Sequence, residues 1–136
     1  MKVNRSMPSS PVIPELAYPD PRAAAAWLEQ LFGFEVTLRI GNHRIQMRAG
    51  EGHVVLTEAR PGAPTAGVDH GVMLRVEDCD AMYARAAASG AVVSGEPQDF
   101  PFGERQFSAL DPFGHRWTFS QSIADVDPAE WGGEAG

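Results

Sequence analysis

Apolar and polar residues recur with two different periods along the first half of the chain, and these periods predict its secondary structure. Alternation over residues 12–18 is typical of a β-strand. Asp20 and Pro21 then predict the start of a helix over residues 22–32, where apolar positions recur every three to four residues. Gly33 follows as a natural terminator. Further strands are expected at residues 35–40, 43–48 and 53–59.

The second half repeats this order of elements after a stretch that lacks any apolar period. Residues 61–69 are rich in proline and glycine and are expected to form a linker. A strand over residues 71–76 comes next. The helix after it is capped by Asp78 or Asp80 and ends at Gly90. Further strands are expected at residues 91–94, 105–110 and 116–120, with a loop at 95–103. Both halves therefore have the order β-α-β-β-β.

A single module of this kind cannot bury both the apolar stripe of its helix and the apolar face of its sheet. Two modules side by side can do so. The sequence therefore predicts an α+β fold in which two βαβββ modules form a curved, mixed sheet of eight strands. The helices would cover the convex side and leave a cup on the concave side. We expect one domain at residues 11–121 (modules at about 11–60 and 70–121), a loose tail at 1–10 and a C-terminal tail at 122–136.

Strand alternation also divides the side chains between the core and the cup. The core is expected to contain Leu16, Val72, Leu74, Trp117 and Phe119. The side chains expected to line the cup and bind a ligand are Ile13, Glu15, Ala17, Glu58, Met73, Arg75, Thr118 and Ser120. The charges of Glu15 and Arg75 are costly in a cup unless they are paired. Two interpretations stay open: an ion pair, between these two or with Glu58, or an Arg75 guanidinium that orients an anionic or carbonyl group of a ligand.

Composition and charge disfavour several classes of function. The 136 residues suffice for one globular domain, and 43% hydrophobic with 21% charged residues argues against disorder. The formal net charge of −7 would repel nucleic acids and anionic membranes, so neither is expected as a partner. No apolar run approaches the ~20 residues of a membrane span, and the first residues lack the apolar core of a secretory signal. The single cysteine fits the reducing cytoplasm, where we expect the protein to be located.

The motifs of common catalytic machinery are absent from the sequence. It contains no HExxH, CxxC, GxSxG, P-loop or GxGxxG, so nucleophilic catalysis, phosphoryl transfer and dinucleotide binding have no support. Cys79 lies next to a helix cap without a catalytic partner and is interpreted as a bystander thiol.

Several polar and aromatic residues near turns have two interpretations. Glu104, Arg105 and Gln106 form either a solvated hairpin end or a polar rim of the cup. Trp131 has no periodic partners and is expected to dock on the domain or on a second subunit, after a helical turn at 127–128. The histidines beside turns are expected to be exposed or locally hydrogen-bonded: His43, His53 and His115.

Three stretches together resemble the vicinal oxygen chelate superfamily, which includes glyoxalase I, extradiol dioxygenases and bleomycin-resistance proteins. They are AYPDPRAAAAWLEQLFGFE, VMLRVEDCDAMYARAAASGA and DPFGHRWTFSQ. The last begins with four residues suited to a tight turn and resembles the variant common in glyoxalase-like proteins of the PhnB type. The resemblance covers residues 11–121 and implies paired modules and a homodimer in which a neighbour completes the pocket.

The resemblance also implies where metal-dependent members carry their four inward-facing ligands. Three of these positions fall on Ile13, Gly71 and Thr118, which offer a divalent cation at most one weak donor. Glu58 lies near the remaining position. His70 is next to Gly71 but would point to the other face of a regular strand, unless a bulge turned it inward. Neither a metal nor another cofactor is therefore expected.

We carry three hypotheses forward from the sequence. The first is a metal-independent protein that binds a small organic molecule in the cup, with a sequestration or resistance role, as the resemblance to bleomycin-resistance proteins implies. The second is a metal-dependent lyase, isomerase or dioxygenase whose site is displaced onto Glu58 and His70. The third is a metal-free enzyme that uses Glu15 or Glu58 as a general base beside Arg75.

Overall fold

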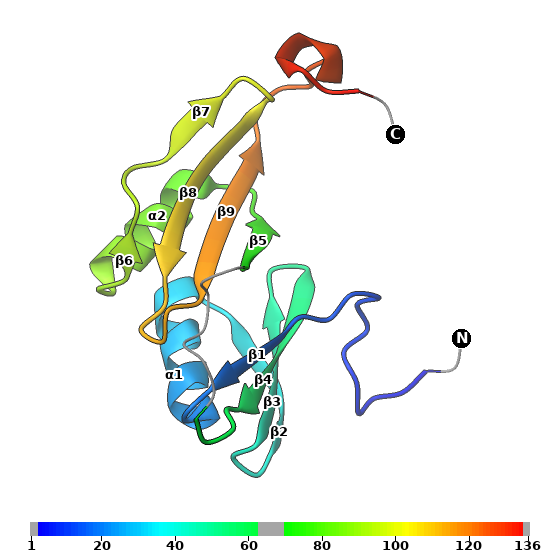
Figure 1. The fold of residues 1–136 in the computed structure, drawn as a ribbon, viewed down its shortest axis with the longest axis vertical. Coiled ribbons are helices and arrows are strands. Elements are labelled where there is room, and N and C mark those ends of the chain that lie inside the picture. The colour runs from blue at the N-terminus through cyan, green and yellow to red at the C-terminus, as the bar shows by residue number, and fades with distance from the viewer. Residues whose placement is uncertain (1–2, 63–69, 135–136) are drawn as a thin grey trace.

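The computed structural model describes residues 3–62 and 70–134, and the two halves of the chain lie one above the other in Figure 1. The first half contains β1 (Glu15–Tyr18), α1 (Pro21–Phe32), β2 (Glu35–Ile40), β3 (Arg44–Ala49) and β4 (Gly52–Glu58). The second contains β5 (Gly71–Arg75), α2 (Cys79–Ala88), β6 (Val92–Val93), β7 (Gln98–Phe100), β8 (Glu104–Leu110) and β9 (Arg116–Ser122), followed by a 3₁₀ turn at Pro128–Trp131. Most of the expected linker, residues 63–69, lies outside the described residues.

The strands confirm the expected α+β fold of two modules. Module one forms a four-stranded sheet in the order β1-β4-β3-β2, which we call sheet one, and β1 is parallel to β4. Module two forms sheet two in the order β5-β9-β8-β6, with β5 parallel to β9 and the short β7 paired with β8. The described strands are thus hydrogen-bonded as two sheets, one for each module. β7 falls within the stretch 95–103, which was expected to be a loop.

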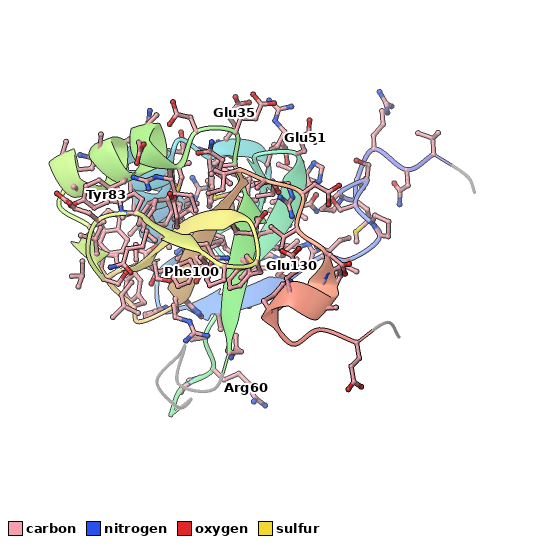
Figure 2. The ribbon with its side chains drawn as sticks, turned by 90° about the horizontal axis from the view of Figure 1, so that it is seen from above. Glu35, Glu51, Arg60, Tyr83, Phe100 and Glu130 are labelled. Carbon is pink, nitrogen blue, oxygen red and sulfur yellow. The ribbon has the colours of Figure 1, made fainter. Side chains whose placement is uncertain are left out.

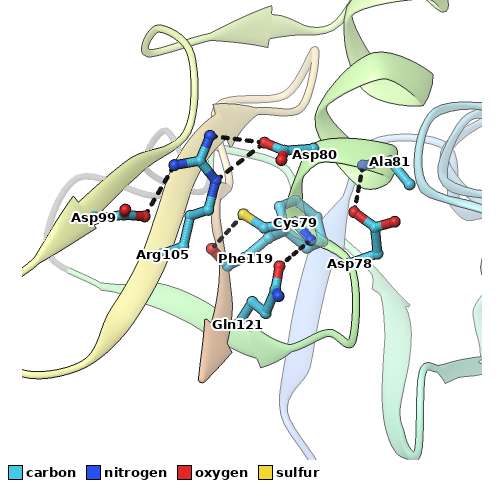
Figure 3. Close-up of polar contacts among 8 residues, drawn as sticks. All are labelled: Asp78, Cys79, Asp80, Ala81, Asp99, Arg105, Phe119 and Gln121. Carbon is cyan, nitrogen blue, oxygen red and sulfur yellow. Dashed lines mark hydrogen bonds and ion pairs between the residues drawn. The ribbon is translucent and has the colours of Figure 1, made fainter. Parts of the chain in front are cut away.

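Both helices begin and end as the sequence predicts. The Asp20 carboxylate accepts a hydrogen bond from the Ala23 amide at 3.3 Å, and Gly33 ends α1 in the left-handed conformation at a φ of 74°. Of the two candidate caps for α2, Asp78 is the one used, because its carboxylate accepts from the Ala81 amide at 3.0 Å (Figure 3). The buried Cys79 opens α2, and its amide donates to Gln121 of β9, which fixes the helix to sheet two (Figure 3).

One hydrophobic core runs through both modules. Phe32 and Phe34, at the end of α1, pack against Trp117 of β9, with ring centroids 5.8 and 5.3 Å apart. Phe32 also contacts Phe119, at 4.9 Å. All four aromatic side chains are buried, so neither module has a complete core of its own.

A single buried carboxylate joins the modules at the turn between β8 and β9. Asp111 accepts hydrogen bonds from the Tyr18 hydroxyl of module one at 2.7 Å and from the Trp117 indole of module two at 3.1 Å. Its other oxygen accepts from two backbone amides of its own turn. The expectation for His115 is wrong, because this side chain is buried between the modules, where its Nε2 donates to the Ala17 carbonyl at 2.9 Å.

The N-terminal segment, residues 3–14, crosses the face of sheet one opposite α1 (Figure 1). It has no regular secondary structure, but it is tied to the sheet. Gln46 donates to the Ser6 carbonyl at 2.9 Å, and the Ser10 hydroxyl bonds the His53 ring at 2.6 Å. Gln46 is only 3% exposed as a result. The segment therefore covers the part of the concave face of module one around Gln46 and Val55.

Candidate functional site

The concave face of sheet two is the candidate site, and strand register determines which side chains it carries. Met73 is paired with Thr118, and Thr118 with Ser108, so these three side chains share one face. The same register brings Arg75, Ser120 and Gln106 to this face. The full set is Gly71, Met73, Arg75, Glu104, Gln106, Ser108, Leu110, Arg116, Thr118, Ser120 and Ser122, with Val92 and Phe100 from the flanking strands.

This face is open to solvent and carries exposed apolar side chains. Met73 is 64% exposed and Val92 65% exposed, and Leu110 and Phe100 are also exposed. Figure 2 looks down on this end of the molecule and shows Phe100 on β7 with Glu130 of the C-terminal turn beside it. Phe100 stacks on Phe102, which in turn contacts Trp131. Trp131 thus docks the C-terminal tail on module two of its own chain, one of the two arrangements expected.

A polar row crosses the upper end of this face. The Glu104 carboxylate accepts hydrogen bonds from Ser120 at 2.6 Å and Ser122 at 2.5 Å, and Arg75 donates to it at 3.3 Å. The hydroxyl bonds, and then the Arg75 charge, lower the pKa of Glu104. Arg75 therefore pairs with Glu104, a partner that the sequence analysis did not consider.

Glu104 and Gln106 belong to the concave face, whereas Arg105 does not. Arg105 points to the helix side, where its guanidinium binds Asp80 of α2 and Asp99 of β7, each at 2.9 Å (Figure 3). Of the two interpretations of this charged run, a polar rim of the cup fits its first and third residues.

The predicted cup residues of module one are only partly brought to the site. Ile13 is half-buried just before β1, and Glu15 and Ala17 lie on the concave face of sheet one. The prediction that Glu58 faces the cup is wrong. Glu58 is paired with the buried Tyr18 and shares its helix-side face, so Thr57 takes the concave position. Glu15 is exposed and lies 3.7 Å from Arg44, so it is paired neither with Arg75 nor with Glu58.

The side chains on this face do not suit a divalent cation, which needs three or four converging donors. Within the part of the chain that the structure describes, no three His, Cys, Asp or Glu side chains could hold a metal ion together. At Gly71, one of the positions implied for a ligand, the space is taken by a positive group. A Cβ built there would lie 2.8 Å from Nε of Arg116 and 3.1 Å from its Nη2. His70, next to it, is exposed and lies before the first residue of β5.

A hollow indents the same face at its β6 edge. Its volume is about 170 Å³, and its walls are largely apolar. It is lined by Val92, Val93, Ser94, Ser108, Ala109, Leu110 and Arg116. Arg116 thus borders the hollow, while its guanidinium lies over Gly71 on the neighbouring part of the open face.

The carboxylates near this face are poorly placed to act as general bases. Glu58 points away, Glu15 is exposed, and the lowered pKa of Glu104 weakens it as a proton acceptor. What the face offers is hydroxyls, one guanidinium engaged by a carboxylate, a second guanidinium over Gly71, and an apolar hollow with exposed apolar side chains around it. These are features of ligand binding.

Sequence reasoning missed the contribution of β8 and β6, which supply Ser108, Leu110 and Val92. The alternation of residues 105–110 could have found the first two, since it places Ser108 and Leu110 on the same side as Thr118 once the hairpin at 111–114 is assumed. Arg116 was missed because the strand was assigned from its aromatic residues.

The two βαβββ modules, with a hollowed concave face on sheet two, define a class of small α+β proteins with paired modules. The family model of the Glyoxalase/Bleomycin resistance protein/Dioxygenase superfamily matches residues 12–119. The chain therefore belongs to this superfamily. The assignment to the PhnB-type variant stays a prediction.

Solved structures share the fold over most of the chain. TioX from Micromonospora sp. ML1 is 34% identical, with a TM-score of 0.70, over 85% of this chain and 100% of its own. A bleomycin resistance determinant encoded on transposon Tn5 has a TM-score of 0.71 over 85% of this chain and 100% of its own, but is 19% identical. Lactoylglutathione lyase from Agrobacterium tumefaciens is 21% identical, with a TM-score of 0.64, over 84% of this chain and 94% of its own. The last two show the fold alone.

An uncharacterized protein of Mycobacterium bovis is 37% identical over 59 residues. These residues are 43% of this chain and 39% of that protein, so the match spans about two fifths of the relative's length. None of the helices among the described residues has both the length and the apolar character needed to cross a membrane.

Proposed function

We propose that this protein binds a small organic molecule on the concave face of sheet two without the help of a metal. One observation carries the proposal: Gly71 and Thr118, which stand where metal ligands are implied, lie among hydroxyls and exposed apolar side chains, and the Arg116 cation covers Gly71. A second positive charge is repelled at such a place, whereas an organic molecule with apolar surface and hydrogen-bond acceptors is attracted. Sequestration of that molecule, in the cytoplasm, is the role that we propose.

The proposal includes a second copy of the chain that closes over the open face. The exposed Val92 and its strand partner Leu110 support this, together with Met73 at the other edge of the sheet, because exposed apolar side chains on one face favour association. A stable interface of standard size buries about 800 Å² on each partner, so it would extend over several strands. The superfamily's resistance proteins, which the sequence resembles, also pair in this way.

The relatives support the proposal without deciding the ligand. The Tn5 protein is a bleomycin resistance determinant by name, and its fold matches that of this chain over its full length. TioX is similar in sequence as well as in fold. We infer that the ligand of this chain is a small organic molecule. The shared fold does not indicate its chemical class.

A thermal-shift screen of aromatic and heterocyclic metabolites, run with EDTA present, tests the proposal. Binding should raise the melting temperature, since a ligand at 100 times its dissociation constant adds about 2.7 kcal/mol to stability. Replacing Thr118 with Trp should abolish the shift by filling the face, whereas Glu58→Gln, on the other face, should leave it unchanged.

Two results would contradict the proposal. One is the absence of saturable binding by any compound while the circular dichroism spectrum shows a folded protein. The other is a stoichiometric metal ion, found by elemental analysis of protein purified without chelator, whose removal abolishes ligand binding. Light scattering coupled to size exclusion tests the second copy, with a dimer expected for the wild type and a larger monomer fraction for Met73→Asp.

A further inference from the structure

The position of Arg116 indicates which chemical class of molecule the open face takes. Arg116 is the first residue of β9 and is paired with Gly71 on one side and with Leu110 on the other. Because glycine has no side chain, the guanidinium lies across Gly71, with its Nε 2.8 Å from the place of a Cβ. Arg116 is also among the residues that line the hollow of about 170 Å³, whose walls are almost entirely apolar. One residue thus borders an apolar recess and carries its positive charge over the neighbouring Gly71.

The two arginines of this face differ in their charge partners. Arg75 is engaged by Glu104, with its Nη1 3.3 Å from the carboxylate. No carboxylate of residues 3–62 or 70–134 lies within ion-pairing distance of Arg116. Its guanidinium can therefore form two parallel hydrogen bonds with a carboxylate from outside. The net charge of −7 opposes an anion at long range, but this repulsion is screened beyond about 8 Å at physiological salt.

The recess itself has the size and surface for one aromatic ring. A cavity of about 150 Å³ lined by apolar side chains is known to hold benzene. Val92 and Leu110 supply apolar surface, and the Ser108 hydroxyl is hydrogen-bonded to that of Thr118 at 2.8 Å. The guanidinium at the rim would then meet a substituent of the ring rather than the ring itself.

We propose that this end of the concave face binds an aromatic carboxylate, with its ring in the hollow against Val92 and Leu110 and its carboxylate on Arg116. This inference rests on the proposed function and narrows it from an organic molecule to an aromatic anion. The charge of Arg116 selects the occupant: an aromatic cation would be repelled by it, and a neutral ring would gain no charge-assisted hydrogen bond from it.

Three probes of similar size that differ in charge test the inference: 4-methylbenzoate, 4-methylbenzamide and 4-methylbenzylammonium. Dissociation constants are measured by NMR titration of the uniformly ¹⁵N-labelled full chain, with the arginine Nε–Hε signals observed as well. We expect the carboxylate to bind at least about tenfold more tightly than the amide, as a charge-assisted pair requires, and the ammonium to bind most weakly. The Arg116 Nε–Hε signal should shift with the carboxylate.

Matched variants separate charge from general disruption. Arg116→Gln should reduce the preference for carboxylate over amide to about twofold or less, because only the charge-assisted pair is lost. As a control outside this face, Arg39→Gln removes an exposed guanidinium of sheet one and should leave the preference intact. Leu110→Asp should abolish binding of 4-methylbenzoate by placing a charge in the hollow. Circular dichroism and melting temperature confirm that each variant is folded.

The results distinguish this inference from the proposed function. If the amide or the ammonium binds as tightly as the carboxylate, or if Arg116→Gln keeps the preference, the aromatic-carboxylate inference is overturned. The inference is also overturned if none of the three probes binds while a compound of the wider screen does. In all of these cases the proposed function stands. If no probe and no screened compound binds to the folded protein, both fail.

Discussion

Apart from the short β7, the two modules have the same order of elements, yet their concave faces differ in how far apolar and polar side chains are covered. In sheet one, Gln46 and Val55 are 3% and 0% exposed on the concave side. In sheet two, Met73 and Val92 on the concave side are 64% and 65% exposed. The N-terminal segment accounts for the difference, because it binds Gln46 through the Ser6 carbonyl and β4 through the Pro14 carbonyl. The two modules thus share their topology but differ in which parts of their concave faces are accessible.

The difference in exposure between the two faces determines where a ligand or a partner can bind. A face covered by its own chain gains stability but loses access, whereas an open face keeps access and exposes apolar area to water. Each prediction below concerns one of the two faces or the joint between the modules, by which we mean Asp111 and its hydrogen bonds to Tyr18 and Trp117.

The largest effect is expected at the joint. Asp111→Ala leaves the Tyr18 hydroxyl and the Trp117 indole buried without their acceptor and opens a cavity. Each buried donor left unsatisfied costs about 1–3 kcal/mol, so we expect a total loss of about 2–5 kcal/mol. Urea unfolding should show this loss in the free energy of unfolding, and a change below about 1 kcal/mol would mean that the joint does not hold the modules together.

A matched pair of substitutions tests the contrast between the faces directly. Val55→Asp places a charge under the N-terminal segment and should lower the free energy of unfolding by about 3 kcal/mol, because a buried, unpaired charge is costly. Met73→Asp, on the open face, should change it by no more than about 0.5 kcal/mol in dilute monomeric protein. Equal effects, measured by urea unfolding, would show that the two faces are equally covered.

Alkaline pH should weaken the closed joint. Burial, and then the charge of Asp111, raise the pKa of Tyr18 above its usual value of 10.0. The folded state therefore keeps the proton above pH 10 while the unfolded state releases it, so stability is full below pH 10 and falls as pH rises further. The loss is up to about 1.4 kcal/mol per pH unit. Melting temperatures from pH 8 to 11 should show this fall, and Tyr18→Phe should flatten it.

Acid pH should act on the open face, with a smaller effect. Hydrogen bonds from Ser120 and Ser122, and then the Arg75 charge, lower the pKa of Glu104 from its usual value of 4.5. Its contribution to stability is therefore present above pH 4.5 and is lost as pH falls through the lowered pKa. We expect Glu104→Ala to cost less than about 1 kcal/mol at pH 7, since its Arg75 partner is exposed. The difference from wild type should vanish at low pH, and a constant difference down to pH 2.5 would contradict this.

The sequence predicted the parts of the fold that depend on local chemistry. Asp20 and Gly33 bound the first helix as expected, because caps and terminators act within a few residues. Alternation correctly assigned Met73 and Thr118 to the concave face, because each lies inside a regular strand. Placement of the predicted ligand-binding residues on this face is geometry only, and their role in binding stays a prediction.

The errors arose where position depends on a distant partner. Glu58 was assigned to the wrong face because a shift of one residue in a strand reverses every side chain, and the β1–β4 pairing sets that register. β7 was missed because it forms only by pairing with β8. The burial of His115 depends on the Ala17 carbonyl, 98 residues earlier in the chain. None of these contacts leaves a local signal.

Asp111 has a consequence for how the chain folds as it is synthesised. Tyr18 leaves the ribosome long before residue 111 has been translated, so during that interval its hydroxyl has no native acceptor. The core of the first half is therefore completed only after the second half has been synthesised. Although the fold consists of two similar modules in tandem, the two modules reach their native structure together.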